Sequence, residues 1–229
     1  MTIGYPLTDS VYDMTNRFID LAPSLPGSPP TTPENEDRGA DAFLTFINDT
    51  LRPWIRTVAF PPNQIKFTRD ALYGHSFGGI FVVYALVARP GMFDTYIAAT
   101  PTVSWNNGSL LDEVSRRWGT PCPGTSVFDD AVCANETDTT DGPKPAVFLT
   151  YGSAEQFPPR RRTETEAAFQ ERKALWRTFR QTEVTHELFD RLVAGRRARD
   201  VTLKEYAGMD HAGVASSTIA DGIPYFVDW

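Results

Sequence analysis

Tyr73-Gly74-His75-Ser76-Phe77-Gly78-Gly79 is the stretch that decides the fold. It places a serine between two glycines, after the predicted strand 65–73 and before the apolar run 80–88. This G-x-S-x-G pattern is typical of a nucleophile elbow, a cramped turn that only glycine-sized neighbours permit. In such a turn the serine hydroxyl projects above the sheet, and the helix N-terminus points amide dipoles at it. We therefore predict that Ser76 attacks a carbonyl; the alternative is a tight strand-to-helix turn without chemistry.

Predicted strands and helices alternate along the rest of the chain. Further strand patterns occupy residues 95–100, 146–151 and 201–206, and helical patterns cover 38–55, 80–88 and most of 163–194, with a break near 182–185. This alternation predicts an α/β fold with a mostly parallel sheet and helices on both faces. Residues 7–35 hold five prolines and predict a long loop. A chain of 229 residues favours one domain spanning residues 1–229.

Three polar residues stand just after predicted strands, where ligands bind in sheets of this kind. They are Ser76, Glu155 and His211, and they follow the α/β-hydrolase order of serine, acid and histidine. A serine hydroxyl is too weakly acidic to attack unaided, so an imidazole must remove its proton. His211 is the predicted base, because His75 lies inside the elbow and His186 lies within a predicted helix. The alternative for His211 is a loop histidine bonded to local backbone.

Glu155 is the predicted acid of this constellation. A carboxylate after the third strand and its glycine turn would accept the second imidazole N–H and stabilise the imidazolium formed during attack. Asp210 adjoins the histidine, but neighbouring loop side chains rarely aim at one another, and Glu164 and Glu166 are assigned to a solvated helix face. An acid-free Ser-His dyad is the next alternative.

The Phe77 amide, directly after the nucleophile, is the predicted first donor of an oxyanion hole. The second donor of such a site normally comes from a loop after an earlier strand. Only 75 residues precede Ser76, and many of them belong to the proline-rich segment. The sequence therefore leaves the second donor unassigned.

Charge and composition exclude several classes of function. A net charge of −7 argues against nonspecific nucleic-acid binding, which needs clustered Lys and Arg. The apolar run 80–88 is too short to cross a bilayer, so we expect no membrane span. No N-terminal signal pattern is visible, which predicts a cytoplasmic protein, with secretion as the alternative. Cys122 and Cys133 fit either a local disulfide or two reduced thiols.

No cofactor or catalytic metal is expected from the sequence. No histidine pair has the helical spacing of metal ligands, and no phosphate-cradling glycine loop is present. The predicted partner is a small-molecule ester substrate. The sequence does not indicate an oligomeric state.

A series of segments together resembles one known family. Arg17–Pro23 is similar to its R-x-x-D-L-T-P motif with alanine in place of threonine, and Thr100–Trp105 is similar to its S-P-S-x-W-W motif. The other matching segments are Ile3–Pro6, Gly39–Leu44, Gly74–Gly79, Gly152–Glu155 and His211–Val214. The family is the putative-esterase family of α/β-hydrolases, and within it the siderophore esterases of the enterobactin, salmochelin and fusarinine type.

This resemblance implies a serine ester hydrolase that works through an acyl-enzyme on a siderophore or a related metabolite. It implies Ser76 and His211 as catalytic, Glu155 as the acid, and Trp105 and Arg17 near the substrate. In relatives the Ile3–Pro6 motif follows further strands and an oxyanion loop, so the α/β-hydrolase fold is expected to be N-terminally truncated here. The alternatives are an acyltransferase or thioesterase of secondary metabolism, and a truncated, non-catalytic binding protein.

Overall fold

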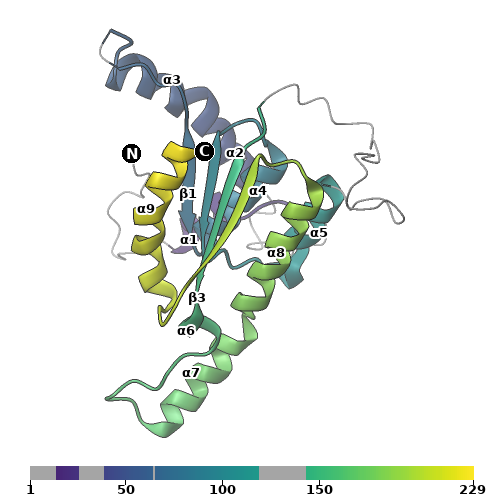
Figure 1. The fold of residues 1–229 in the computed structure, drawn as a ribbon, viewed down its shortest axis with the longest axis vertical. Coiled ribbons are helices and arrows are strands. Elements are labelled where there is room, and N and C mark those ends of the chain that lie inside the picture. Colours follow the sequence, from purple (N-terminus) through teal and green to yellow (C-terminus); the bar gives the residue numbers. More distant parts are fainter. Residues whose placement is uncertain (1–13, 26–38, 64, 119–142) are drawn as a thin grey trace. The chain divides into compact units, whose positions relative to one another are not determined.

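The computed structural model describes residues 14–25, 39–63, 65–118 and 143–229 (Figure 1). The chain divides into two compact units, Met1–Thr68 and Arg69–Trp229. The segment Ile3–Pro6, Cys122 and Cys133 lie outside the described residues. Within the described residues, no helix combines the length and the apolar character needed to cross a membrane.

Four parallel strands form the sheet of the second unit. They are β1 (Ala71–His75), β2 (Thr95–Ala99), β3 (Ala146–Gly152) and β4 (Asp200–Tyr206), and they lie side by side in chain order. His75 stands opposite Ala99, and Ala99 stands opposite Thr150. Because all four strands run the same way, their carboxyl ends meet at one edge of the sheet, as the alternating pattern predicted.

Helices cover both faces of this sheet (Figure 1). On one face lie α4 (Phe77–Ala88) and α8 (Gln181–Gly195), with α5 (Ser109–Trp118) in contact with both. On the other face α9 (His211–Asp228) contacts β1, β2 and β3. The prediction of a mostly parallel sheet between two helical layers is therefore confirmed.

Strand periodicity explains the packing of α9. Alternate side chains of a strand point to opposite faces of the sheet, and every residue of the two central strands is buried. Ile97 and Phe148 point toward α9, where Tyr225 stacks on Phe148 with 4.9 Å between the ring centroids. The Tyr225 hydroxyl also donates to the carbonyl oxygen of Val147 at 2.9 Å. These contacts fasten the C-terminal half of α9 to the sheet.

The long helical prediction over residues 163–194 is correct in type, but its break lies earlier than expected. α7 (Glu166–Thr178) and α8 are separated at residues 179–180, where Arg180 has the left-handed φ of 49°. No residue of α7 is buried, whereas α8 buries Val184, Leu188 and Leu192. The break therefore separates a helix that packs into the core from a helix without buried residues.

The structure differs from the sequence analysis in three details. Residues 65–70 are not a strand; β1 begins at Ala71 and continues through His75. Within the segment predicted as a loop, residues 14–21 form a helix, α1 (Met14–Leu21). Helix α9 was not predicted, although it carries His211 as its first residue.

In the first unit, residues 40–59 are helical throughout. The segment consists of α2 (Ala40–Phe46), the π-helical turn η1 (Ile47–Leu51), α3 (Arg52–Trp54) and a second π-helical turn, η2 (Ile55–Ala59). Its start is held to α1, because the Gly39 amide donates to the carbonyl oxygen of Ile19 at 2.8 Å. A side chain at Gly39 would place Cβ 3.0 Å from that same oxygen. The predicted helix is confirmed and extends slightly further than expected.

Candidate active site

Ser76 occupies a strained turn between β1 and α4. Its φ of 60° and ψ of −117° lie outside the regions that non-glycine residues normally adopt. The glycines around it permit the turn: a Cβ at Gly74 would lie 2.2 Å from the carbonyl oxygen of Gly78, and a Cβ at Gly79 would lie 2.9 Å from Cα of Pro101. Such strain between a strand and a helix is the geometry that a nucleophile elbow requires.

The turn also fixes the amides near the serine. The Ser76 amide donates to the carbonyl oxygen of Ala99 at 3.0 Å, which ties the turn to the end of β2. Phe77 is the first residue of α4, so its amide points out of the N-terminal end of that helix. An oxyanion held at this position would also meet the positive end of the helix dipole.

Glu155 is a fully buried carboxylate whose two oxygens each have a partner. It lies in α6 (Ser153–Gln156), directly after β3, and its side chain has 0% exposure. Oε1 accepts from the Gly152 amide at 2.7 Å, and Oε2 lies 2.7 Å from Nδ1 of His211. The close approach depends on Gly152, because a Cβ there would lie 2.2 Å from the carbonyl oxygen of Met209.

His211 begins α9 and faces the elbow. Both ring hydrogen bonds that it makes within the described residues use Nδ1, one to Glu155 and one to Thr100 Oγ1 at 2.8 Å. Nε2 takes part in neither of them. His75 Nε2 lies 2.7 Å from the carbonyl oxygen of His211, and the two rings are 4.7 Å apart between centroids. Because Ser76 follows His75 directly, the structure brings Ser76, Glu155 and His211 to the same edge of the sheet.

A tyrosine on β1 fastens the start of α9 beside this site. The Tyr73 hydroxyl donates to the carbonyl oxygen of Ala215 at 2.9 Å. Burial raises the pKa of Tyr73 to about 12, so the group remains a neutral donor at physiological pH. The first turn of α9, and with it His211, is thereby held against β1.

The alternative acids are engaged elsewhere. Asp210 caps α9, since its Oδ1 accepts from the Gly213 amide at 3.0 Å. Glu164 does not lie on a solvated helix face as expected: it precedes α7, its side chain is only 10% exposed, and it pairs with Arg172 at 2.7 Å. Those hydrogen bonds with Arg172 lower the pKa of Glu164 to about 2. Neither carboxylate is bonded to the His211 ring.

The two residues expected near a substrate fall in different units. Trp105 begins the short helical turn η3 (Trp105–Gly108) and packs edge-on against Phe77, with 5.5 Å between ring centroids. It therefore lies beside the residue that follows Ser76. Arg17 lies on α1 in the first unit. Its place near the substrate stays a prediction.

Two residues that contact the His211 ring were not singled out from the sequence. Thr100 follows β2 directly, is fully buried and has a φ of 40°. Trp176 lies on α7, and its ring centroid is 5.4 Å from that of His211. The structure ends β2 at Ala99, so Thr100 stands just after a strand, although the sequence pattern placed it within one.

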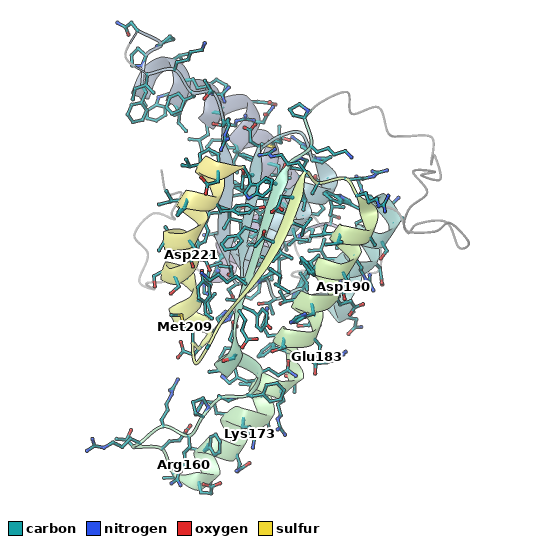
Figure 2. The ribbon with its side chains drawn as sticks, viewed as in Figure 1. Arg160, Lys173, Glu183, Asp190, Met209 and Asp221 are labelled. Atoms are coloured by element: carbon teal, nitrogen blue, oxygen red, sulfur yellow. The ribbon has the colours of Figure 1, made fainter. Side chains whose placement is uncertain are left out.

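A cavity of about 580 Å³ opens beside the imidazole. Figure 2 labels Met209, just before α9, and Lys173 on α7; the cavity lies between these two elements. Its lining includes Glu155, His211, Trp176, Met209, Arg161 and Arg172. Ser76 is not among the residues that line it. Within the described residues, no group of three or more His, Cys, Asp or Glu could hold a metal ion.

Comparisons with known proteins identify the family of this chain. The sequence profile of a family described as putative esterase matches residues 21–216. A siderophore enterobactin esterase of Emericella nidulans is 36% identical over 231 residues, which cover 98% of this chain and 70% of the relative. A siderophore triacetylfusarinine C esterase of Aspergillus fumigatus is 32% identical over 230 residues, which cover 100% of this chain and 70% of the relative.

Solved structures show the same fold. The siderophore hydrolase EstB from Aspergillus nidulans matches with a TM-score of 0.81 at 32% identity, over 99% of this chain and 70% of that one. The siderophore hydrolase EstA from the same organism matches with a TM-score of 0.78 at 35% identity, over 97% of this chain and 69% of that one. The predicted α/β-hydrolase fold is therefore confirmed.

Proposed function

Because the chain belongs to the putative esterase family, we propose that it is a serine esterase that cleaves carboxylic esters through an acyl-enzyme. One observation carries the proposal. The Nδ1 atom of His211 lies 2.7 Å from a fully buried carboxylate, while the same histidine contacts the residue next to a strained Ser76. A serine, a histidine and an acid at the carboxyl edge of a parallel sheet are the parts that ester hydrolysis needs.

In the first half of the reaction, Ser76 Oγ attacks the ester carbonyl carbon. His211 Nε2 takes the hydroxyl proton and then passes it to the leaving alcohol. The negative charge that develops on the carbonyl oxygen is stabilised by the Phe77 amide at the start of α4. In the second half, His211 removes a proton from water, and the water attacks the acyl-enzyme to release the acid and restore Ser76.

Glu155 orients the base throughout this cycle. Its Oε2 accepts the Nδ1–H of His211, so the lone pair stays on Nε2, where the serine proton must go. Its Oε1 is held by the Gly152 amide, which prevents the carboxylate from rotating away. The imidazolium formed during attack is stabilised by this buried negative charge.

We place the substrate among siderophore esters or related metabolites. The enterobactin and triacetylfusarinine C esterases at 36% and 32% identity support this substrate class. Trp105, packed on Phe77 beside the nucleophile, would contact the substrate, and Arg17 would contribute a positive charge to its binding. Both side chains belong to the motif segments that resemble the family.

The proposal is tested by incubating the purified protein with enterobactin and with triacetylfusarinine C, each with and without bound iron. Hydrolysed products are measured by mass spectrometry for the wild type, Ser76→Ala and the matched control Ser216→Ala. Ser216 is an exposed serine on α9. We expect products from the wild type and the control only. Equal hydrolysis by Ser76→Ala would refute the serine mechanism, and no hydrolysis by any form would refute the substrate class.

A further inference from the structure

The buried hydroxyl of Thr100 contacts the same imidazole atom as Glu155. Its Oγ1 lies 2.8 Å from His211 Nδ1, while Glu155 Oε2 lies 2.7 Å from that atom. Resting on the proposed function, we propose that Thr100 is a positioning residue that holds the His211 imidazole for proton transfer. It stands at the end of β2, whereas Glu155 follows β3. The two side chains thus contact the same ring nitrogen from the ends of neighbouring strands.

The backbone of Thr100 is held in a conformation that its sequence disfavours. Its φ of 40° is rare for a β-branched residue, and the following Pro101 favours an extended conformation at this position. The conformation persists because the neighbouring groups are fixed: the Thr100 amide donates to the carbonyl oxygen of Thr150 at 2.8 Å, and Gln181 Nε2 donates to that of Pro101 at 3.1 Å. Strain of this kind concentrates at functional sites.

Proton positions decide what the Thr100 hydroxyl does. A general base needs a free lone pair on Nε2, so the single proton of the neutral ring sits on Nδ1. That N–H points between Glu155 and Thr100, and both oxygens accept from it. A ring held by two acceptors resists rotation about its bond to Cβ. If Thr100 donated instead, the proton would move to Nε2 and the base would be lost.

Two buried threonines in the helices of this unit bond differently. The hydroxyl of Thr185 donates to the carbonyl oxygen of Gln181, and that of Thr218 donates to the carbonyl oxygen of Val214, both within their own helices. Thr100 has no such local acceptor among its hydrogen bonds in the described residues; its hydroxyl partner is the imidazole, 111 residues away. A purely structural threonine needs no contact of this kind.

Thr100 also links the base to the nucleophile turn. Ala99, the residue before it, accepts a hydrogen bond from the Ser76 amide at 3.0 Å. One dipeptide at the end of β2 therefore contacts the backbone of Ser76 and the side chain of His211. A shift of this dipeptide would change the distance between the two reacting groups.

The test compares Thr100→Val, which keeps the branched shape but removes the hydroxyl, with Thr100→Ser, which restores it. Thr150→Val is the matched control, because Thr150 is a buried strand threonine whose hydroxyl meets only Thr218 among its side-chain bonds in the described residues. We expect kcat for a p-nitrophenyl ester to fall about tenfold in Thr100→Val with KM unchanged, since one hydrogen bond is lost. Thr100→Ser and Thr150→Val should keep most of the wild-type kcat.

A second measurement does not depend on the valine variant folding. Nitrogen-15 NMR of the wild type, with His211 assigned by comparison with His211→Asn, should show a neutral ring protonated at Nδ1. A ring protonated at Nε2, or a Thr100→Val enzyme with wild-type kcat, would overturn the role of Thr100. His211→Asn separates failure of the Thr100 role from failure of the proposed function. If the His211→Asn variant kept its activity, His211 would not be the base, and the proposed function would fail as well.

Discussion

Two histidines of the second unit lie near a carboxylate, but only one of them contacts it directly. His211 contacts Glu155 directly, and the carboxylate is fully buried. Across the sheet, His186 on α8 is exposed, and Tyr151 stands between it and Glu205. The Tyr151 hydroxyl donates to Glu205 Oε2 at 2.7 Å, and its oxygen lies 2.9 Å from His186 Nε2.

The difference lies in what each carboxylate can do for its imidazole. Glu155 Oε2 lies 2.7 Å from Nδ1 of His211, so in the proposed mechanism it accepts the Nδ1–H and fixes the tautomer. Glu205 accepts from a phenol instead, and burial together with Glu205 raises the pKa of Tyr151 far above its ordinary value. The phenol therefore stays protonated, and it separates the His186 ring from the Glu205 carboxylate. We therefore expect His211, whose ring contacts its acid directly, to act as the base, and His186 to take no part in the reaction.

The largest contrast is expected between the histidines themselves. His211→Asn removes the base, and we expect kcat/KM for a p-nitrophenyl ester to fall by at least about a thousandfold, because the members of such a triad act as a unit. His186→Asn should leave kcat/KM within about twofold of the wild type, as expected of a surface substitution. Steady-state kinetics of the two variants, with folding checked by circular dichroism, measures the contrast. A similar loss in both would contradict it.

Substitution of Glu155 should reduce activity far more than substitution of Glu205, as for the histidines that each acid accompanies. Glu155→Gln keeps the shape of the side chain but removes the charge that stabilises the imidazolium, and we expect kcat to fall about a hundredfold or more. Glu205→Gln replaces an exposed acceptor of the Tyr151 hydroxyl with an amide that also accepts, so kcat should not change. Single-turnover acylation rates separate the chemical step from product release. Full activity in Glu155→Gln would favour an acid-free dyad.

A glycine substitution should weaken the Glu155–His211 contact without touching either residue. In Gly152→Ala the new methyl would lie 2.2 Å from the carbonyl oxygen of Met209, so the chain before α9 must shift. We expect unfolding free energy to fall by about 1–3 kcal/mol, with a loss of kcat. Gly78→Ala is the control, because a Cβ there meets nothing within 4 Å. Urea denaturation of both variants tests this; equal stability would contradict the close approach.

The smallest expected effect concerns the ion pair between Glu164 and Arg172, a residue that lines the cavity, and this effect depends on pH. The pKa of Glu164 is lowered from 4.5 to about 2 by its hydrogen bonds with Arg172, so the pair stabilises the fold above pH 4.5 and loses that contribution as the pH falls toward 2. Glu164→Gln should therefore lower Tm at pH 6 and match the wild type near pH 2. The exposed Glu166 provides the control variant Glu166→Gln. A Tm difference that does not change with pH would contradict this prediction.

The sequence predicts the candidate site through one rule of topology. Ser76, Glu155 and His211 each stand just after a strand pattern, and parallel strands bring such positions to one edge. Thr100 is the last residue of the strand pattern 95–100, and a threonine in a T-P-T segment carries no chemical signal of its own. Its role depends on a positive φ and on a contact with a residue 111 positions away, and neither is written in local sequence.

The errors in the fold have local causes. Helix α1 has no acidic residue in its first turn and no basic residue in its last, and the prolines after it dominate the pattern. Helix α9 contains Gly213, Gly222 and Pro224, which are poor helix formers, and it is held by packing on the sheet. The prediction of a single domain over residues 1–229 concerns how the two units associate, and it stays a prediction.

The most direct test of the account is covalent labelling of Ser76. The wild type, Ser76→Ala, His211→Asn and His186→Asn are treated with a fluorophosphonate, digested and analysed by mass spectrometry for the modified residue. The account predicts a stoichiometric adduct on Ser76 in the wild type and in His186→Asn, none in Ser76→Ala, and much slower labelling in His211→Asn. An unmodified Ser76 in the folded wild type, or labelling that does not depend on His211, would contradict it.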